Sequence, residues 1–295
     1  MACSSEDLRR RLDLPVPPQS TDVATLERTP IGGGMRTRVR YPGLRDDVHA
    51  FLFQPNQPNG GGVLVQHQHA SQFHLGKSEV AGLVGDALHA FGPALMTQGW
   101  TVLAPDAPGF EDRRPGRPGT SRQPEDWTHY YNLMAHRLVS GELLLTEAIA
   151  DLEVAVGVLA SCSTVGASNI GFLGHSYGGN LGQWMAALDP RLRFACVSGS
   201  TGSYRAKLAR QTALEFSLVI PGIVQGFDIE DLIRLARPKP MLVVAGEDDP
   251  QAADAQDVVA RAGPWAELQL RVVPGGHALD HVRQRIILDW FTLRY

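Results

Sequence analysis

The chain has 295 residues, of which 43% are hydrophobic and 20% are charged, so it can bury a substantial core within a single α/β domain. The formal net charge is −4 and no long basic run occurs, which argues against nucleic acid or an anionic membrane as a partner. The three cysteines, Cys3, Cys162 and Cys196, are too widely spaced for a disulfide framework or a zinc site. We therefore expect a reducing compartment.

The beginning of the chain predicts an intracellular protein with an N-terminal extension. The first residues lack the apolar segment of a signal peptide, and no run approaches the ~20 apolar residues that a transmembrane helix needs. We expect cytoplasmic localisation and no membrane partner. Residues 1–45, rich in proline and arginine, are predicted to wrap the domain or to serve an oligomer contact, and residues 46–295 are predicted to form the domain itself.

Apolar runs bounded by turn residues predict seven strands, at residues 48–53, 62–67, 101–106, 169–174, 193–199, 240–246 and 267–273. Apolar residues at three- and four-residue spacing predict helices over residues 80–95, 145–159, 181–188 and 282–291. Strands that alternate with helices favour a mostly parallel sheet with helices on both faces.

Two segments depart from this alternation. Residues 112–130 form a loop rich in proline and glycine that ends in aromatics, and its Arg113 and Arg114 are interpreted as solvated surface, with substrate contact as the alternative. Residues 200–238 are too long for a tight connection between two strands. We interpret them as a candidate lid, with ordinary packing helices as the alternative.

The sequence Gly174-His175-Ser176-Tyr177-Gly178 lies where a predicted strand gives way to a helix. A turn this sharp strains its central residue, and small neighbours let the strand and the helix pack closely around it. The pattern G-x-S-x-G in this context is a nucleophile elbow, which presents a serine oxygen at the top of a sheet. Serine alone is a weak nucleophile, so it needs a base, an orienting acid and an oxyanion site.

Residues that follow two later strands can supply the base and the acid. His277 lies in a glycine-rich turn after the last predicted strand, at the same carboxyl edge of the sheet as Ser176, and His281 is the weaker alternative. Asp249 follows the strand 240–246 and can hold the far N–H of the imidazole, with Asp248 as the alternative. A carboxylate at such a turn can also be a helix cap.

The oxyanion site needs two backbone N–H donors. We expect one from Tyr177, directly after the nucleophile, and the other from His69 or, as the alternative, Gln68, in the loop after residues 62–67. His67, beneath this loop, shares a strand face with His69, but no carboxylate or thiolate accompanies the histidines and their spacing fits no usual zinc pattern. We therefore expect no metal and no cofactor.

The elbow "GHSYGG", the acid turn "GEDDP" and the "GGH" before the last helix occur in the order Ser, Asp, His. With these motifs the chain resembles the α/β-hydrolases, specifically the dienelactone hydrolases and the related acetyl xylan esterase-like deacylases, over residues 48–294. The resemblance implies an α/β-hydrolase fold, with a mostly parallel sheet of the eight-stranded type, helices on both faces and a small lid insertion. It also implies Ser176 as nucleophile, Asp249 as acid, His277 as base and Tyr177 as an oxyanion donor.

The predicted reaction is cleavage of a carboxylic ester, lactone or thioester of a small molecule through an acyl-enzyme. Acyl transfer, peptide cleavage and carbon–carbon cleavage are alternatives on the same triad, and a non-catalytic ligand binder is the alternative outside enzymes. The expected partners are a small-molecule ester and, as a possible assembly, a second copy of the chain. The pocket is predicted to be walled by apolar side chains, which would equally suit a core: Phe110, Trp127, Tyr130, Tyr131, Phe216, Ile220, Ile223 and Phe227.

Overall fold

The computed structural model describes residues 4–18, 21–166 and 168–294. The strands are β1 (Ala24–Ile31), β2 (Gly34–Pro42), β3 (Asp47–Pro55), β4 (Gly62–Gln66), β5 (Thr101–Pro105), β6 (Ile170–His175), β7 (Leu192–Ser198), β8 (Met241–Gly246) and β9 (Leu268–Val273). The α-helices are α1 (Ser5–Arg11), α2 (Lys77–Val80), α3 (Phe91–Thr97), α4 (Asp126–Val139), α5 (Leu144–Ala160), α6 (Tyr177–Leu188), α7 (Tyr204–Arg210), α8 (Ile229–Leu235), α9 (Ala255–Ala262) and α10 (His281–Thr292). Short 3-10 helices are η1 (Ala87–His89), η2 (Glu111–Arg113), η3 (Phe216–Leu218) and η4 (Ile223–Gln225).

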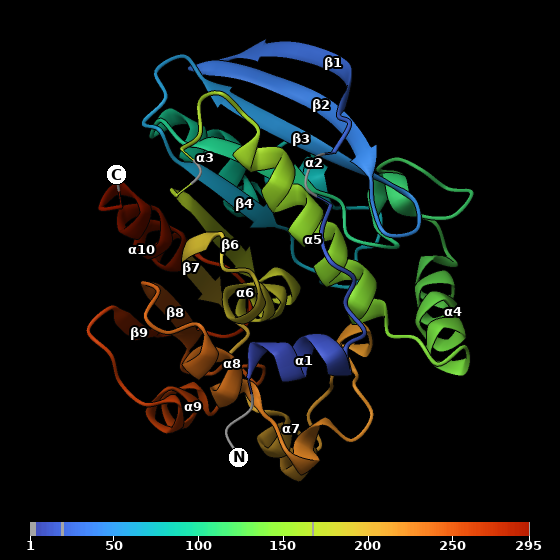
Figure 1. Ribbon diagram of the computed structural model, residues 1–295, viewed down its shortest axis with the longest axis vertical. Helices are drawn as coiled ribbons and strands as arrows, with labels where there is room; N and C mark the ends of the chain where they lie inside the picture. The colour runs from blue at the N-terminus through green and yellow to red at the C-terminus, as the bar shows by residue number, and fades with distance from the viewer. Residues whose placement is uncertain (1–3, 19–20, 167, 295) are drawn as a thin grey trace.

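All the strands of the described residues form one sheet of nine, in the order β1-β2-β3-β5-β4-β6-β7-β8-β9 (Figure 1). The six strands from β5 to β9 in this order are parallel, and β1, β2 and β3 form an antiparallel edge. The mostly parallel sheet is confirmed, and every one of the seven predicted strands is present. The expected eight-stranded type is corrected to nine strands.

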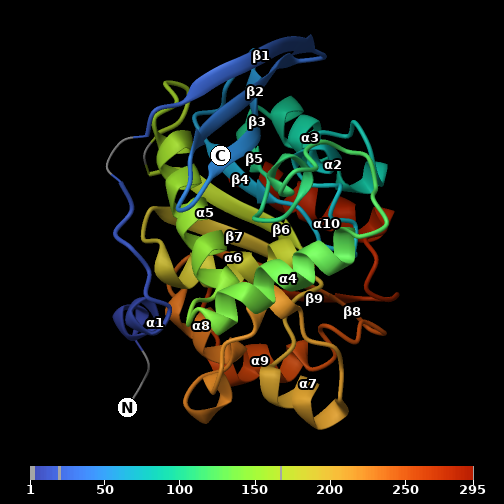
Figure 2. The same ribbon diagram turned by 90° about the vertical axis from the view of Figure 1, so that its right-hand side faces the viewer.

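The additional strands β1 and β2 come from residues that were assigned to the N-terminal extension of residues 1–45. In β2 the side chains of Thr37, Val39 and Tyr41 are buried at alternate positions, so this strand belongs to the sheet. Arginines stand between them, and β1 is largely exposed. A strand with one charged face and little apolar content is hard to recognise from an apolar run. Figure 2 shows this hairpin at one end of the molecule, with α7 and α9 at the other.

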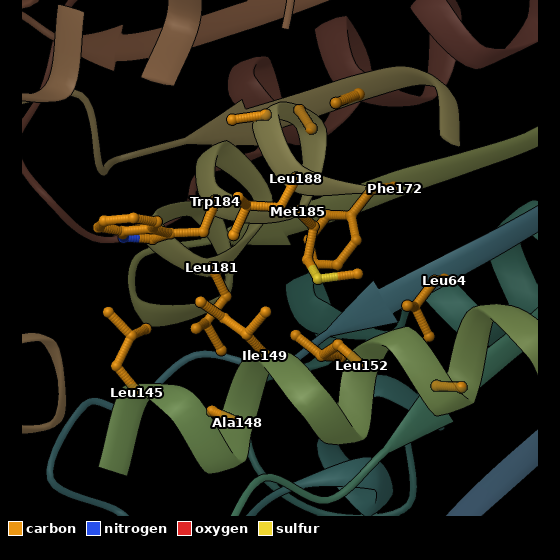
Figure 3. Close-up of a cluster of buried hydrophobic side chains, with 14 of the residues drawn as sticks. Leu64, Leu145, Ala148, Ile149, Leu152, Phe172, Leu181, Trp184, Met185 and Leu188 are labelled. Atoms are coloured by element: carbon orange, nitrogen blue, oxygen red, sulfur yellow. The ribbon is translucent and has the colours of Figure 1, made fainter. Parts of the chain in front are cut away.

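Helices cover both faces of the sheet, because neighbouring residues of each strand point in opposite directions. Leu64 and Phe172 face a core cluster that includes α5 and α6, whereas Val65 and Leu173 face a second cluster with α3 and α10. Figure 3 shows the first cluster between α5 and α6, with Phe172 against their side chains. Within the described residues, no helix combines the length and the apolar character that crossing a membrane requires.

The helices predicted over residues 145–159, 181–188 and 282–291 are confirmed as α5, α6 and α10. The prediction of a single helix over residues 80–95 is wrong. Gly82 and Gly85 adopt φ values of +68° and +80°, which end the helical path, and the segment divides into α2, η1 and α3.

The arginines of the loop 112–130 are buried, which corrects their interpretation as solvated surface. Arg113 is 5% exposed and pairs with Asp151 at 2.7 Å and with Asp46. Arg114, also 5% exposed, donates from Nη1 to both carboxylate oxygens of Asp126, the first residue of α4, at 2.6 and 2.8 Å. These ion pairs tie a loop rich in proline and glycine to the body of the domain.

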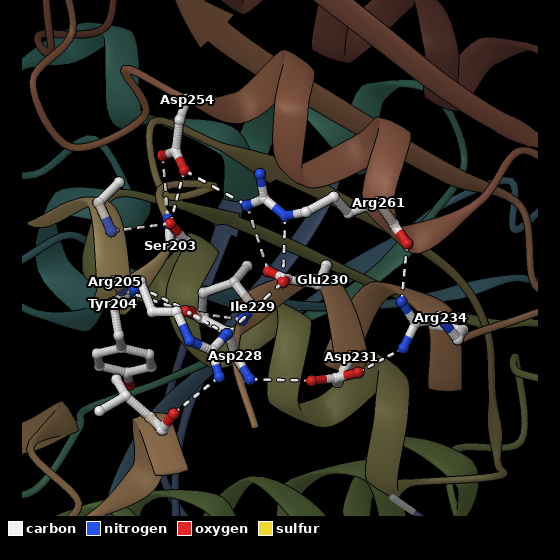
Figure 4. A network of polar contacts seen from close by, with 12 residues as sticks. Ser203, Tyr204, Arg205, Asp228, Ile229, Glu230, Asp231, Arg234, Asp254 and Arg261 are labelled. Atoms are coloured by element: carbon white, nitrogen blue, oxygen red, sulfur yellow. Dashed lines mark hydrogen bonds and ion pairs between the residues drawn. The ribbon is translucent and has the colours of Figure 1, made fainter. Parts of the chain in front are cut away.

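Polar contacts join the first end of the segment 200–238 to Asp254 and join the two ends of the segment to each other (Figure 4). Ser203 donates to Asp254 from its hydroxyl at 2.6 Å, and the backbone N–H groups of Tyr204 and Arg205 donate to Asp228 at 2.7 and 3.1 Å. Leu232, on α8, is fully buried. The alternative interpretation of residues 200–238, as ordinary packing helices, therefore fits α7 and α8. The residues between these two helices are the part that reaches the site described below.

Candidate active site

Four parallel strands end at one edge of the sheet and carry the predicted site residues. β6 is followed by Ser176, β8 by the turn with Asp249, β9 by the turn with His277, and β4 by the loop with His69. Because β4, β6, β7, β8 and β9 are neighbours in the sheet, these four loops lie close together.

Ser176 lies on a strained turn between β6 and α6, with φ of 56° and ψ of −117°. A Cβ atom at Gly174 would lie 2.1 Å from the carbonyl oxygen of Gly178, and one at Gly178 would lie 2.1 Å from that of Gln66. Only glycine fits at either position. The backbone N–H of Ser176 donates to the carbonyl of Ser198 at 2.8 Å, which holds the turn against β7. Strain of this kind persists where the surroundings fix it, and it keeps the side chain at the helix N-terminus.

Ser176, His277 and Asp249 form a hydrogen-bonded chain. Ser176 Oγ lies 2.7 Å from His277 Nε2, and His277 Nδ1 lies 2.9 and 3.1 Å from the two carboxylate oxygens of Asp249. A carboxylate accepts, so Nδ1 carries the proton and Nε2 accepts from the serine hydroxyl. Asp249 is 1% exposed, whereas Asp248 is exposed and its N–H bonds the carbonyl of Gly275. The structure thus brings Asp249, and not Asp248, to the imidazole.

The loop that carries His277 is held by a buried arginine that sequence reasoning missed. Arg283, on α10, is fully buried and donates from Nη2 to the carbonyl of Gly276 at 2.7 Å and from Nη1 to that of His277 at 3.1 Å. No carboxylate of the described residues pairs with it, and its guanidinium donates to these backbone oxygens instead. The rival base, His281, is the first residue of α10, and the structure places no hydrogen bond between it and Ser176.

Tyr177 and His69, the predicted oxyanion donors, line the same cavity as Ser176. Tyr177 is the first residue of α6, where the helix does not use the backbone N–H. The His69 ring accepts at Nδ1 from the N–H of Ser71 at 3.0 Å, so Nε2 carries its proton, 3.3 Å from Glu215 Oε2. Burial lowers the pKa of His69, against the opposing effect of Glu215. The ring is therefore neutral at neutral pH.

Two other residues of this loop that the sequence analysis considered, Gln68 and His67, make hydrogen bonds within the protein. Gln68 donates its side-chain amide to Glu79 at 3.0 Å, and burial raises the pKa of Glu79 to about 7. His67 is buried beneath the loop, as predicted, and its Nε2 accepts from the N–H of Ala107 at 3.1 Å. Burial lowers the pKa of His67 to about 4, so this ring is also neutral.

The loop after β4 ends on a buried ionic cluster. Lys77 is 1% exposed, and its Nζ lies 2.8 Å from both Asp106 and Asp112 and also contacts Glu111. These three carboxylates are close enough together to share a metal ion, but the ammonium group of Lys77 already provides the cation at their centre. The second such acidic group, around Asp151, is occupied in the same way by Arg113.

A cavity of about 400 Å³ opens onto Ser176 and His277. Its other lining residues are His69, Ala70, Ser71, Trp127, Tyr177, Asn180, Gly199, Ala213, Leu214, Glu215, Phe216 and Gln251. Of the predicted pocket residues, Trp127 and Phe216 line this cavity. Glu215, Asn180 and Gln251 were missed, because nothing in their local sequence distinguishes them from other surface polar residues.

The other predicted pocket residues have different places. Phe110 is fully buried and stacks on Tyr177 with ring centroids 5.8 Å apart, and Tyr130 is 2% exposed beneath the cavity. Ile220, like Ile223 and Phe227, is in the main core cluster. Tyr131 is half exposed and meets the ring of Phe216 edge-on from outside. These side chains do not line the cavity, because most of them fill space between elements where the prediction expected an open wall.

A parallel sheet with a serine on a strained turn between strand and helix defines the class of the α/β hydrolases. The sequence model of the alpha/beta hydrolase fold family matches residues 80–232, just over half of the chain, so the chain belongs to this family. The predicted family and fold are thereby confirmed.

Similar proteins agree with this assignment. The chain is similar to YtaP of Bacillus subtilis (strain 168), a protein named as a provisional hydrolase. The two sequences are 29% identical over 206 residues, which cover 68% of this chain and 64% of YtaP. The chain thus matches less than two thirds of the length of that relative.

Solved structures share the fold at lower identity. Acetyl xylan esterase 1 from Thermoanaerobacterium sp. JW/SL YS485 superposes with a TM-score of 0.67 at 16% identity, over 100% of this chain and 95% of the other. A glucuronoyl esterase from Solibacter usitatus gives 0.65 at 15% identity, over 99% and 92% of the two chains.

Proposed function

We propose that the protein is a serine esterase that cleaves a carboxylic ester of a small molecule through an acyl-enzyme. The observation that carries the proposal is the continuous chain of hydrogen bonds from Ser176 through His277 to Asp249, at 2.7 and 2.9 Å. A nucleophile bonded to a base, which is in turn oriented by a buried acid, is the arrangement that activates a serine hydroxyl.

In the first step, Ser176 Oγ attacks the ester carbonyl carbon while His277 Nε2 takes the hydroxyl proton. Asp249 keeps the imidazole in the tautomer that can accept at Nε2 and stabilises the imidazolium. His277 then gives the proton to the leaving alcohol, and the acyl group remains on Ser176. Water repeats the sequence, with His277 as its base, and releases the acid.

The developing oxyanion needs fixed N–H donors beside Ser176. The N–H of Tyr177 is available at the helix N-terminus, where the dipole also favours negative charge. The N–H of His69 supplies the second donor in the proposal, with that of Gln68 as the alternative. The packing of the His69 ring against Phe73 and Tyr130, with ring centroids 4.9 and 5.3 Å away, fixes the position of this loop.

Three observations support an ester as the substrate. The cavity is of the size that holds a small molecule and reaches Ser176 directly. Two of the solved structures that share the fold over almost the whole chain are an acetyl xylan esterase and a glucuronoyl esterase by name. In addition, the triad residues occupy the ends of β6, β8 and β9, in the order that this family uses for acyl transfer.

The test is covalent labelling of the serine combined with ester turnover. The parent protein and its Ser176→Ala variant are treated with a fluorophosphonate, and the adduct is measured by intact mass beside assays on a series of p-nitrophenyl esters. We expect one adduct on the parent, none on the variant, and ester hydrolysis only by the parent. A folded parent protein that forms no adduct and hydrolyses no ester would refute the proposal.

A further inference from the structure

Glu215 is a carboxylate in the wall of the active-site cavity that the proposed mechanism does not use. It lies between α7 and η3, and its side chain is 20% exposed. Oε1 accepts from the Ser217 hydroxyl at 3.1 Å and from the hydroxyl of Tyr130 at 3.4 Å. Oε2 lies 3.3 Å from His69 Nε2, the nearest ring nitrogen. A carboxylate has about four acceptor positions, so Oε2 can accept a further donor from the cavity.

The negative charge of Glu215 is not balanced by an ion pair. Ser217 and Tyr130 are neutral donors, and the nearby His69 ring is neutral, since burial lowers its pKa. The buried Lys207 lies near enough for its charge to act on Glu215, but it forms no ion pair with this carboxylate. No lysine or arginine of the described residues lines the cavity. Within the described ranges, Glu215 is the one carboxylate among the residues that line the cavity, and its charge favours a cation over an anion beside it.

Two aromatic rings stand beside this carboxylate. Trp127 and Phe216 both line the cavity, with ring centroids 5.6 Å apart. The faces of aromatic rings attract a positively charged nitrogen, and tryptophan does so best. A carboxylate next to two such rings provides the two interactions by which proteins bind alkylammonium groups.

We propose that Glu215, Trp127 and Phe216 form a subsite for a positively charged nitrogen, so that the preferred substrates are esters that carry an ammonium group. This inference rests on the proposed esterase function and adds the class of substrate. It assigns Glu215 a role in specificity and not in the chemical step.

The test compares two esters of nearly the same shape and different charge, acetylcholine and 3,3-dimethylbutyl acetate, by acid release at constant pH 7.5. We expect the parent to show a kcat/KM at least about tenfold higher for the cationic ester. In Glu215→Gln the ratio of the two kcat/KM values should fall to about one. Asp257→Asn, which removes an exposed charge on α9, should keep the parental ratio.

A binding measurement separates this inference from the esterase proposal. Choline and its neutral analogue 3,3-dimethylbutanol are titrated calorimetrically into the Ser176→Ala variant, which needs no turnover. We expect choline to bind at least about tenfold more tightly. Equal or weaker binding of choline, or a parental kcat/KM ratio near one, would overturn the subsite, even with fluorophosphonate labelling intact. Failure of labelling together with preferential choline binding would overturn only the esterase proposal.

A separate control shows whether the Glu215→Gln variant is folded: its melting curve and its labelling by the fluorophosphonate are compared with those of the parent.

Discussion

Replacing Lys77 with methionine would test the buried ionic cluster that ends the loop after β4. The ammonium group is 1% exposed and is the shared partner of Asp106, Glu111 and Asp112. Lys77→Met keeps most of the side-chain volume but leaves these carboxylates without their cation in a buried site. Removing one partner of a buried ion pair typically costs about 3–5 kcal/mol. For a chain of this length we expect the melting temperature to fall by about 6–10 °C.

The cost should depend on pH in a definite direction. Burial raises the pKa values of Asp106 and Glu111 even with Lys77 present, and loss of the cation should raise them further. A carboxyl whose pKa is higher in the folded state than in the unfolded state destabilises the protein fully above the folded-state pKa. The destabilisation shrinks as pH falls below that pKa and is lost below the unfolded-state pKa. The difference in unfolding free energy between parent and variant should therefore shrink as pH falls from about 7.5 to about 5.

The assay is urea unfolding followed by circular dichroism at several pH values. Arg40→Met is the matched control, because Arg40 pairs with Asp47 at 3.2 Å with both side chains nearly half exposed. Such a surface pair contributes less than about 1 kcal/mol. A Lys77→Met variant as stable as the control, or one whose deficit grows at low pH, would refute the reasoning.

Three further predictions concern the site and its supports. Asp249→Asn should lower kcat by about 10³–10⁴-fold in steady-state assays, because the imidazole loses its orienting acceptor, whereas Asp248→Asn should change it less than about twofold. Arg283→Lys keeps the positive charge but loses the planar guanidinium that donates to two carbonyl groups. We expect kcat to fall about 10- to 100-fold with little change in KM. An unchanged kcat would show that Arg283 does not position His277. Glu79→Gln should raise the unfolding free energy at pH 8 by about 1–3 kcal/mol and leave it unchanged near pH 5, because burial raises the pKa of Glu79 to about 7 and its ionisation above that pKa opposes folding. Urea unfolding at the two pH values measures this, and an equal effect at both would contradict it.

The sequence was sufficient to predict the central strands and the residues that now lie around Ser176. The buried strands β6 and β8 are continuous apolar runs with no polar face, so their ends could be located to within one or two residues. In a parallel sheet all such ends meet at one edge, and this places His277 and Asp249 near Ser176 without knowledge of any contact. Glycines at 174 and 178 pointed to the turn because no side chain fits there.

Other features depend on packing that a local pattern does not contain. Phe110 and Trp127 are both aromatic residues of one irregular segment, but Phe110 is fully buried and Trp127 is 46% exposed. Which of them faces the cavity is decided by the ring of Tyr177 and by the ion pairs of Arg113 and Arg114, which fold the segment inward. Arg113 pairs with Asp46, 67 positions away, and Arg114 with Asp126, 12 positions away across the loop. A charged residue with partners outside its own local pattern looks solvated in the sequence, so the interpretation of both arginines was wrong.

The residues proposed to select the substrate and those proposed to carry out the reaction lie on different kinds of structure in this fold. The groups proposed for chemistry follow buried strands of a nine-stranded sheet, and Arg283 fixes one of their loops. Glu215 and Phe216 lie in an irregular stretch between α7 and α8, outside the regular strands and helices. Buried side chains such as Leu218 and Ile220 anchor the stretch to the core, whereas Glu215 and Phe216 are themselves only partly buried. Loops positioned by a rigid scaffold tolerate change more readily than the scaffold does. Substitutions at Glu215 and Phe216 should therefore change the order of preferred esters more than they change the rate at which a small fluorophosphonate labels Ser176.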